Sequence, residues 1–165
     1  RLDRTNATTP DPLNPTVTIN VGETRTEGVE LALTGRVRPN WQITGGYSWL
    51  DARLQGNDSV RLAQTPKQQF SVWNRYDVSR RLGFGLGVIH QSSQFAAIRT
   101  STVTTRLPAF TRVDAAVYYR VSDTVRLQLN IENLLDTTYF SDAHNNFNIS
   151  TGAPLNARLT LTTRF

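Results

Sequence analysis

The chain has 165 residues, of which 38% are hydrophobic and 19% charged, a composition that excludes both a disordered chain and a helical membrane protein. Cysteine is absent, so disulfide scaffolds, thiolate metal sites and cysteine nucleophiles are also excluded. The net charge of +5 is spread along the chain, with only Arg80 and Arg81 adjacent, and this spread argues against nucleic-acid binding. Neither an initiator Met nor a charged-then-apolar leader opens the sequence, so we expect any signal peptide to lie outside it or to have been removed.

Alternation of apolar and polar residues recurs along the chain, and no stretch carries a convincing helical period. No window approaches the roughly 18 consecutive apolar residues that a membrane-spanning helix needs, so any membrane crossing would use strands. In the first alternating stretch, Val29, Leu31 and Leu33 share one side and Glu30 and Thr34 share the other. The pattern predicts seven strands, at 29–37, 41–49, 70–78, 82–88, 113–121, 125–131 and 157–165.

The connections between these strands alternate in length. Tight turns are predicted at 38–40, 79–81 and 122–124, and long Ser/Thr/Asn/Gly-rich loops at 55–66, 92–108 and 136–154. All short turns would then lie at one end of the sheet and all long loops at the other, as in outer-membrane barrels. Residues 1–15 are expected to form a further long loop, and residues 16–26 to extend the first strand beyond the membrane.

A soluble β-sandwich also alternates polar and apolar faces, but its strands usually have about 5 or 6 residues. With the residues that flank the alternating ranges, the predicted strands have about 9 to 13 residues, which at a tilt near 45° cross a hydrocarbon band about 25 Å tall. Aromatic residues lie near the ends of the apolar faces, with Trp41 and Phe165 by the short turns and Trp49 and Phe110 by the long loops. The sequence therefore favours an all-β fold, an antiparallel transmembrane β-barrel, with membrane-girdle residues Trp41, Tyr47, Trp49, Tyr76, Tyr119 and Phe165.

The polar face of the predicted strands carries charges that a lumen holding water or a polar plug can solvate. Gly83, Gly85 and Gly87 share this face, where we expect a twist or a close backbone approach rather than a ligand site. Seven strands cannot close a standard barrel, because bacterial single-chain barrels have even numbers, so residues 1–165 are interpreted as part of a larger barrel. The charged residues expected on the inner face are Arg36, Arg120, Arg126, Glu132 and Arg158.

Several sequence runs together resemble the TonB-dependent siderophore receptors of the outer membrane, over essentially the whole chain. The runs are GETRTEGVE at 22–30, GGYSWLDA at 45–52, LPAFTRVD at 107–114, and NIENLLD at 130–136 followed by Tyr139, with an aromatic last residue. The loop at 142–149 followed by Gly152-Ala153-Pro154 resembles the catecholate-type receptors. The resemblance implies a barrel of roughly 22 strands with an N-terminal plug domain, of which this chain would hold the last seven strands.

By that resemblance, the intact protein would bind a ferric siderophore in its outer loops and import it with energy from TonB, without making or breaking a bond. The expected partners are the TonB complex through a plug domain, outer-membrane lipid and lipopolysaccharide, the barrel-assembly machinery through the C-terminal strand, and the siderophore as cargo. The expected location is the outer membrane of a Gram-negative bacterium, and no cofactor is expected. Haem, cobalamin or a glycan as cargo, or a passive porin or autotransporter barrel, are the alternatives.

An anionic iron chelate attracts Arg, accepts hydrogen bonds from amides and hydroxyls, and stacks on aromatic rings. Neither His90 nor His144 lies near a carboxylate pair with metal-ligand spacing, and His90 is expected at the membrane interface. Ser141 and Asp142 lie close to His144 in sequence, but adjacency in a loop is weak support for a hydrolase triad, so no catalytic residue is expected. The candidate ligand-binding loop residues are Arg61, Gln64, Gln91, Phe95, Arg99, Tyr139, His144, Asn145 and Asn146.

Overall fold

The computed structural model describes residues 1–11, 14, 16–98 and 104–164, which form strands and connecting loops without a helix. Among these residues, no helix is long and apolar enough to cross a membrane. Phe165 and Arg99, predicted to belong to a membrane girdle and to a ligand site, lie outside the described residues.

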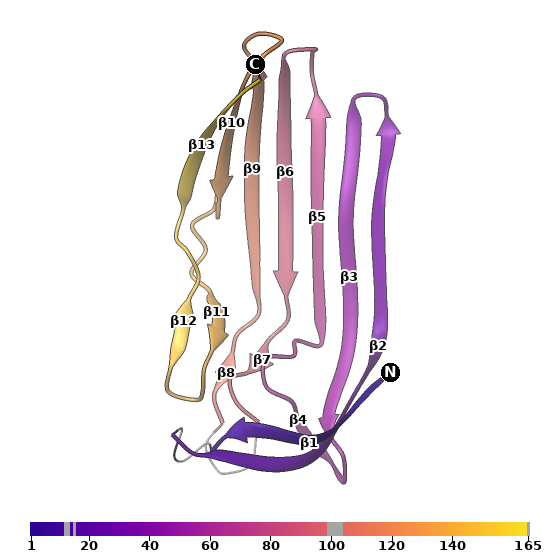
Figure 1. Ribbon diagram of the computed structural model, residues 1–165, viewed down its shortest axis with the longest axis vertical. Helices are drawn as coiled ribbons and strands as arrows, with labels where there is room; N and C mark the ends of the chain where they lie inside the picture. The colour runs from indigo at the N-terminus through magenta and orange to yellow at the C-terminus, as the bar shows by residue number, and fades with distance from the viewer. Residues whose placement is uncertain (12–13, 15, 99–103, 165) are drawn as a thin grey trace.

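Seven long antiparallel strands form one sheet in which spatial order follows chain order (Figure 1). All seven were predicted from the alternation, because apolar residues dominate one face of each. Their neighbours are paired without a crossover, so every connection is a hairpin. The strands are β2 (Thr18–Arg38), β3 (Trp41–Leu54), β5 (Gln68–Asp77), β6 (Leu82–Gln91), β9 (Phe110–Arg120), β10 (Val125–Glu132) and β13 (Asn156–Thr163).

The two ends of the sheet differ, as the loop lengths predicted. Short turns join β2 to β3, β5 to β6 and β9 to β10 at one end, drawn at the top of Figure 1. At the other end the long loops contain short strands of their own. These are β4 (Asn57–Arg61), β7 (Gln94–Phe95), β8 (Arg106–Leu107), β11 (Phe140–Ala143) and β12 (Ile149–Thr151).

The strand register keeps apolar side chains on one face of the sheet. Residues that are opposite each other on neighbouring strands point to the same side, so a row of paired residues defines a face. One such row includes large side chains that remain strongly exposed, with Leu159 at 68% of its full accessibility. A continuous exposed apolar band of this kind suits contact with lipid rather than water. The row runs through Trp41, Tyr76, Phe84, Val117, Leu129 and Leu159.

The opposite face carries the polar residues and the glycines of β6. Trp73 lies across Gly85 and Gly87, and a Cβ atom at either glycine would overlap its indole ring. The expected close approach is therefore made by an aromatic side chain of the neighbouring strand. The register also places on this face the charged residues predicted for it, in rows such as Arg36–Gln42–Arg75.

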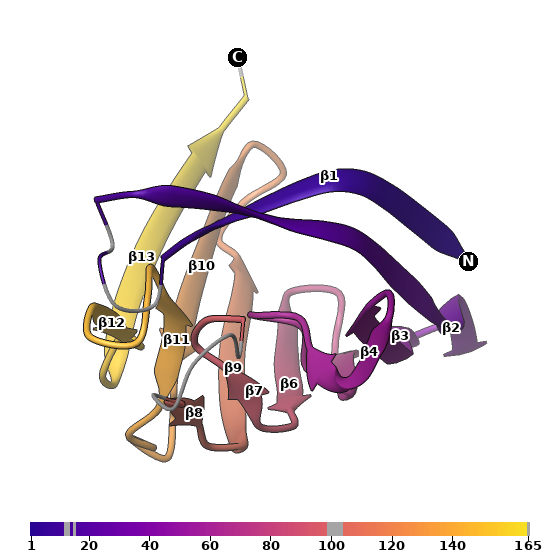
Figure 2. The same cartoon turned by 90° about the horizontal axis from the view of Figure 1, so that it is seen from below.

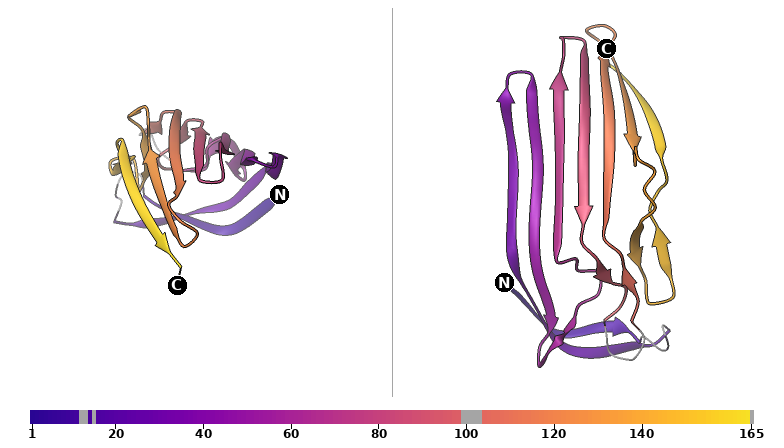
Figure 3. Two further views of the ribbon diagram at one scale, coloured as in Figure 1. Left: turned by 90° about the horizontal axis from the view of Figure 1, so that it is seen from above. Right: turned by 180° about the vertical axis from the view of Figure 1, so that it is seen from behind.

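The prediction that residues 1–15 form a loop is wrong for most of them. Strand β1 (Leu2–Pro10) pairs antiparallel with the outer part of β2. Asn6 and Gly22 adopt positive φ angles of 52° and 88° where the pairing is irregular, and such bulges bend a hairpin. The β1–β2 hairpin extends over the concave side of the curved sheet at the long-loop end (Figures 2 and 3).

The sheet is an open arc and not a closed barrel. It ends at β13 on one side, and on the other side β2 pairs with β1 only as far as Thr26, which leaves its remaining length without a second neighbour among the described strands. Edges that expose backbone groups and an apolar face are liable to associate with other strands. This geometry agrees with the interpretation of the chain as part of a larger barrel.

Candidate functional site at the long-loop end

The three long loops are linked to one another by hydrogen bonds. Gln64, whose φ is +50°, donates its backbone N–H to the carbonyl of Phe95 at 2.9 Å and its side-chain amide to the carbonyl of Ala143. Thr105 donates its backbone N–H to the side-chain oxygen of Asn146 at 3.1 Å. Because each loop bonds to another, the loops form one assembly rather than independent flaps.

A small apolar core lies beneath this assembly. Ala96, Leu107 and Ala143 are almost fully buried there, one from each of three short strands or their flanks, and Phe140 and Ile149 pack against them. The two alanines let the loop backbones approach closely around the larger side chain of Leu107. Burial of these side chains stabilises the loops by the hydrophobic effect, in addition to the hydrogen bonds between them.

An aromatic stack joins the third loop to the wall of the sheet. Tyr139 is buried and stacks on Phe110 with ring centroids 4.5 Å apart, while Gly152 leaves room for the tyrosine ring. Arg112 donates to the Tyr139 hydroxyl at 3.0 Å and to Asp114 at 2.8 Å. Phe110 shares the polar face with Arg112, so its predicted place at the end of the apolar face is wrong. The aromatic ring anchors a loop instead.

Asn133 is the centre of the same network and is completely buried. Its φ of +54° is one that asparagine tolerates better than most residues. Its backbone N–H donates to Asp114 at 2.8 Å, and its side chain bonds to both the N–H and the carbonyl of Thr137 and to the carbonyl of Ala153. These bonds fix where the loop leaves β10 and where it returns towards β13.

The predicted ligand-binding residues take several different roles. Asn145 and Asn146 are buried and bond within the loops, and Tyr139 is buried in the stack described above. Gln91 ends β6 on the polar face, and Phe95 in β7 is half-buried. His144 is exposed at the tip of the β11–β12 hairpin. Whether any of these residues contacts a ligand stays a prediction.

A charged cluster lies at the outer end of β3, beyond the predicted girdle residue Trp49. Asp51 accepts hydrogen bonds from Arg53 at 3.0 Å and from Arg61 at 3.0 Å. The hydrogen bond from Arg53, reinforced by the positive charges of Arg61 and Lys67, holds the pKa of Asp51 below its ordinary value despite partial burial. Arg61 is therefore held at the surface of the loop assembly with part of its guanidinium open to solvent.

Phe147 is an exposed loop residue that the sequence predictions did not include among the candidate ligand-binding residues. It lies between Asn146 and Asn148 at the tip of the β11–β12 hairpin and is 68% exposed, the same fraction as the band residue Leu159. A single exposed apolar side chain is common on protein surfaces, so it is the place of Phe147 on the linked loops that makes its ring a candidate for stacking on a ligand. Its position beside three asparagines, between two short strand segments, is the signal that could have identified it.

His90, and Ser141 and Asp142 beside His144, are residue types that can form metal or hydrolase sites. His90 lies on the apolar face, stacks on Phe70 at 5.5 Å and pairs with the hydroxyl of Thr111 at 2.8 Å, as an interfacial residue would. Among the described residues, no hydrogen bond joins Ser141, Asp142 and His144, and no group of three His, Cys, Asp or Glu side chains could hold a metal ion.

The predicted girdle residues that the structure describes all lie on the apolar face. Trp41, Tyr76 and Tyr119 are near the short turns, and Tyr47 and Trp49 are near the long loops. Trp41 donates its indole N–H to the side-chain oxygen of Asn74 on the same face at 3.3 Å. Two aromatic bands at opposite ends of an apolar face match the arrangement in which aromatic rings lie at both membrane interfaces.

Comparison with known proteins gives consistent matches. The family model described as TonB dependent receptor-like, beta-barrel matches residues 1–134. A probable TonB-dependent siderophore receptor, PiuA of Acinetobacter baumannii, is 32% identical over 147 residues, which cover 80% of this chain and 19% of PiuA. The catecholate siderophore receptor Fiu of Escherichia coli is 32% identical over 128 residues, covering 72% of this chain and 16% of Fiu.

A solved structure extends the match to nearly the whole chain. The crystal structure of the siderophore receptor PiuA from Acinetobacter baumannii superposes with a TM-score of 0.81 at 28% identity, covering 98% of this chain and 24% of that protein. The chain therefore spans no more than about a quarter of the length of these relatives.

Proposed function

Because this chain belongs to the TonB dependent receptor-like β-barrel family, we propose that it is the last part of the barrel of an outer-membrane receptor that imports a ferric siderophore with energy from TonB. The observation that carries the proposal is the sheet itself. It has a lipid-compatible apolar face, a polar inner face, and a linked loop assembly at one end only. A barrel wall of this kind can hold a binding site at its outer mouth and a solvated path behind it.

The cargo class is argued from the chemistry of the loop assembly. Arg61 offers a cationic group, His144 and Phe147 offer exposed rings, and all three lie on linked loops. A ferric catecholate is anionic and aromatic, so it gains from charge-assisted hydrogen bonds and from stacking. The catecholate receptor Fiu, with 32% identity, supports this class of cargo over haem, cobalamin or a glycan.

The remaining partners follow from the same proposal. TonB would act on a plug domain elsewhere in the polypeptide, outer-membrane lipid and lipopolysaccharide would cover the apolar face, and the barrel-assembly machinery would engage β13. The family is one of transport receptors, and we propose no catalytic residue. The energy for import would come from TonB, while this chain would supply part of the barrel wall and part of the loop assembly at its outer opening.

Binding to the purified full-length receptor tests the proposal. A ferric catecholate titrated into the protein in detergent should bind, and Phe147→Ala should weaken binding about fivefold because an aromatic stack is worth about 1 kcal/mol. Asn148→Ala, which alters an exposed neighbour in the same loop, should leave the affinity unchanged. Binding of haem, cobalamin or a glycan in place of the chelate would contradict the cargo class.

A liposome experiment separates the receptor from a passive pore. Liposomes holding the full-length protein should retain small solutes, because a plugged receptor has no open channel. Steady leakage of sugars and salts through the unliganded protein would support a porin and contradict the proposal.

A further inference from the structure

A line of aromatic rings and guanidinium groups follows the polar face of the sheet across β5, β6 and β9. It begins at Arg112, whose guanidinium is bonded to Tyr139 of the loop assembly, and continues through Trp73, Arg75 and Tyr118. In the order Arg112, Trp73, Arg75 and Tyr118, their register partners on β6 are Ile89, Gly87, Gly85 and Gly83. Each row is two residues, about 7 Å, further from the loops than the one before. Consecutive rows of this face thus each carry a ring or a guanidinium group.

Trp73 presents an open face of its indole ring on this line. The three atoms nearest to a Cβ placed at Gly85 belong to the six-membered part of the indole, and the other three atoms of that ring are nearest to a Cβ placed at Gly87. One face of the ring therefore lies flat on the backbone of β6, and the other is turned away from the sheet. The side chain is only half-buried, which leaves that second face able to stack on an aromatic group.

The charges beside Trp73 are balanced. Asp114 is in the same row and accepts a hydrogen bond from Arg112 at 2.8 Å. Glu132 and Arg158 line a small cavity of about 160 Å³ next to the indole. Each carboxylate near the ring thus has an arginine close by, so these carboxylates do not exclude an anion from the open face of the ring.

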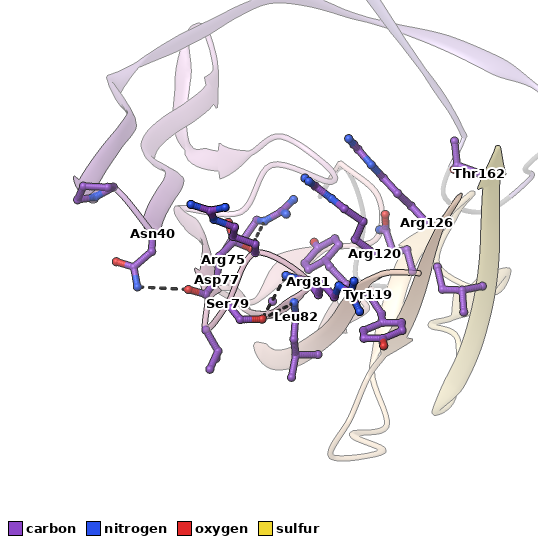
Figure 4. Close-up of a pocket in the computed structure, with 17 residues that line it drawn as sticks. Asn40, Arg75, Asp77, Ser79, Arg81, Leu82, Tyr119, Arg120, Arg126 and Thr162 are labelled. Atoms are coloured by element: carbon purple, nitrogen blue, oxygen red, sulfur yellow. Dashed lines mark hydrogen bonds and ion pairs between the residues drawn. The ribbon is translucent and has the colours of Figure 1, made fainter. Parts of the chain in front are cut away.

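Beyond Trp73 the line reaches a cavity of about 630 Å³ at the short-turn end, drawn in Figure 4. Arg75 and Tyr118 form part of its wall, with the guanidinium carbon of Arg75 4.2 Å from the ring centroid of Tyr118. Arg120 and Arg126, which are register partners, extend side by side from the sheet there (Figure 4). Five arginines and one aspartate line this cavity, so it attracts an anion, and its volume suits a small ligand.

We infer that Trp73 is a transit site, on which an aromatic, anionic iron chelate stacks as it moves from the loop assembly to the cavity. The inference rests on the proposed function and deepens it, because it assigns part of the import path to named residues. The guanidinium groups of Arg112 and Arg75, one row before and one row after the ring, attract the charge of the chelate. A path of this kind needs sites that bind strongly enough to receive the cargo and weakly enough to release it. One aromatic stack, which strengthens binding about fivefold, meets both needs.

A segment of the same polypeptide packed on Trp73 in every state would leave no such path. The ring would then be covered whether or not import takes place. A transit site, in contrast, is in contact with the chelate only while TonB drives import. The two cases differ in what touches the ring and when, and cross-linking measures both.

Photo-cross-linking of the full-length receptor in cells tests the inference. Azidophenylalanine in place of Trp73 keeps an aromatic ring and forms covalent bonds with its neighbours on illumination. With radiolabelled ferric dihydroxybenzoate, the label should become attached to the receptor while import proceeds, and not when TonB is absent. The matched control places the same photoreactive residue at Val72, the preceding residue of β5 on the apolar face, where no label should become attached.

Import rates supply a second measurement. At saturating chelate, Trp73→Ala should lower the rate of iron import about fivefold, and Trp73→Phe should restore most of it. Chelate binding to the loops, measured in cells without TonB, should be the same in both variants as in the unsubstituted receptor. Val72→Ala should change neither quantity.

A normal import rate in Trp73→Ala would overturn the inference. So would cross-links from position 73 that join only protein segments, both with and without TonB, since they would assign the ring to a permanent internal contact. TonB-dependent import with no chelate attached at position 73 contradicts only the inference. A receptor that neither binds nor imports the chelate contradicts the proposed function as well.

Discussion

Replacing Asn133 by alanine should release the loop between β10 and β13 from the barrel wall. The substitution removes three side-chain hydrogen bonds from a completely buried site, each worth about 1 kcal/mol net. It also forces alanine into a left-handed conformation at φ +54°, which costs about 1 kcal/mol more. The local opening free energy of the loop should therefore fall by about 4 kcal/mol.

Hydrogen exchange of the full-length receptor in detergent measures this quantity. A loss of about 4 kcal/mol corresponds to roughly a 1,000-fold faster exchange at protected loop amides. The Gly152 N–H, which donates to the carbonyl of Tyr139 at 2.8 Å, is a suitable reporter. Asn133→Gly keeps the left-handed backbone at no steric cost and should lose about 3 kcal/mol, while the exposed control Asn148→Ala should change little. Unchanged exchange in Asn133→Ala would refute the reasoning.

Three further changes probe the loop assembly of the full-length receptor. Gly152→Ala should cost about 1 to 3 kcal/mol, because the added Cβ overlaps the ring of Tyr139, and faster proteolysis of this loop would reveal it. Gln64→Ala should weaken the link between loops by about 1 kcal/mol, seen as faster exchange in β11 without change in β9. Because Arg53 lowers the pKa of Asp51, the ionised Asp51 carboxylate stabilises the folded protein. This contribution to the free energy of unfolding is complete above the ordinary pKa of Asp51 and is lost as pH falls through the lowered one. Asp51→Asn should therefore remove less than about 1 kcal/mol of acid-dependent stability in melts between pH 5 and 3.

The seven long strands could be predicted because a half-buried strand leaves a period of two in its own sequence. Strand β1 could not, since residues 2–10 have no apolar face to alternate, and they pair with β2 through the strand ladder and polar contacts such as that of Asp3 with Arg25. Whether such a segment forms a strand depends on the neighbouring strand with which it pairs, here β2. The short strands within the long loops have two to five residues, too few to leave a period of two in the sequence.

The candidate site was harder to predict than the fold. Phe110 has the same strand parity as Arg112, so the inner position of its ring was available from the sequence, but aromatic residues near strand ends were interpreted as girdle residues. Asn145 and Asn146 have the composition of a solvated loop, but the structure buries them and bonds them to Thr105 and within the hairpin tip. Loop burial depends on contacts between distant segments, which local patterns do not encode.

Uptake of iron by cells tests the central claim most directly. Cells that carry the full-length receptor as their sole route for a ferric catecholate should accumulate labelled iron, and accumulation should stop when TonB is removed or the proton gradient is dissipated. Phe147→Ala should lower uptake at limiting chelate, with the receptor still present in the outer membrane. Iron entry that continues without TonB, at a rate proportional to the outside concentration, would contradict the account.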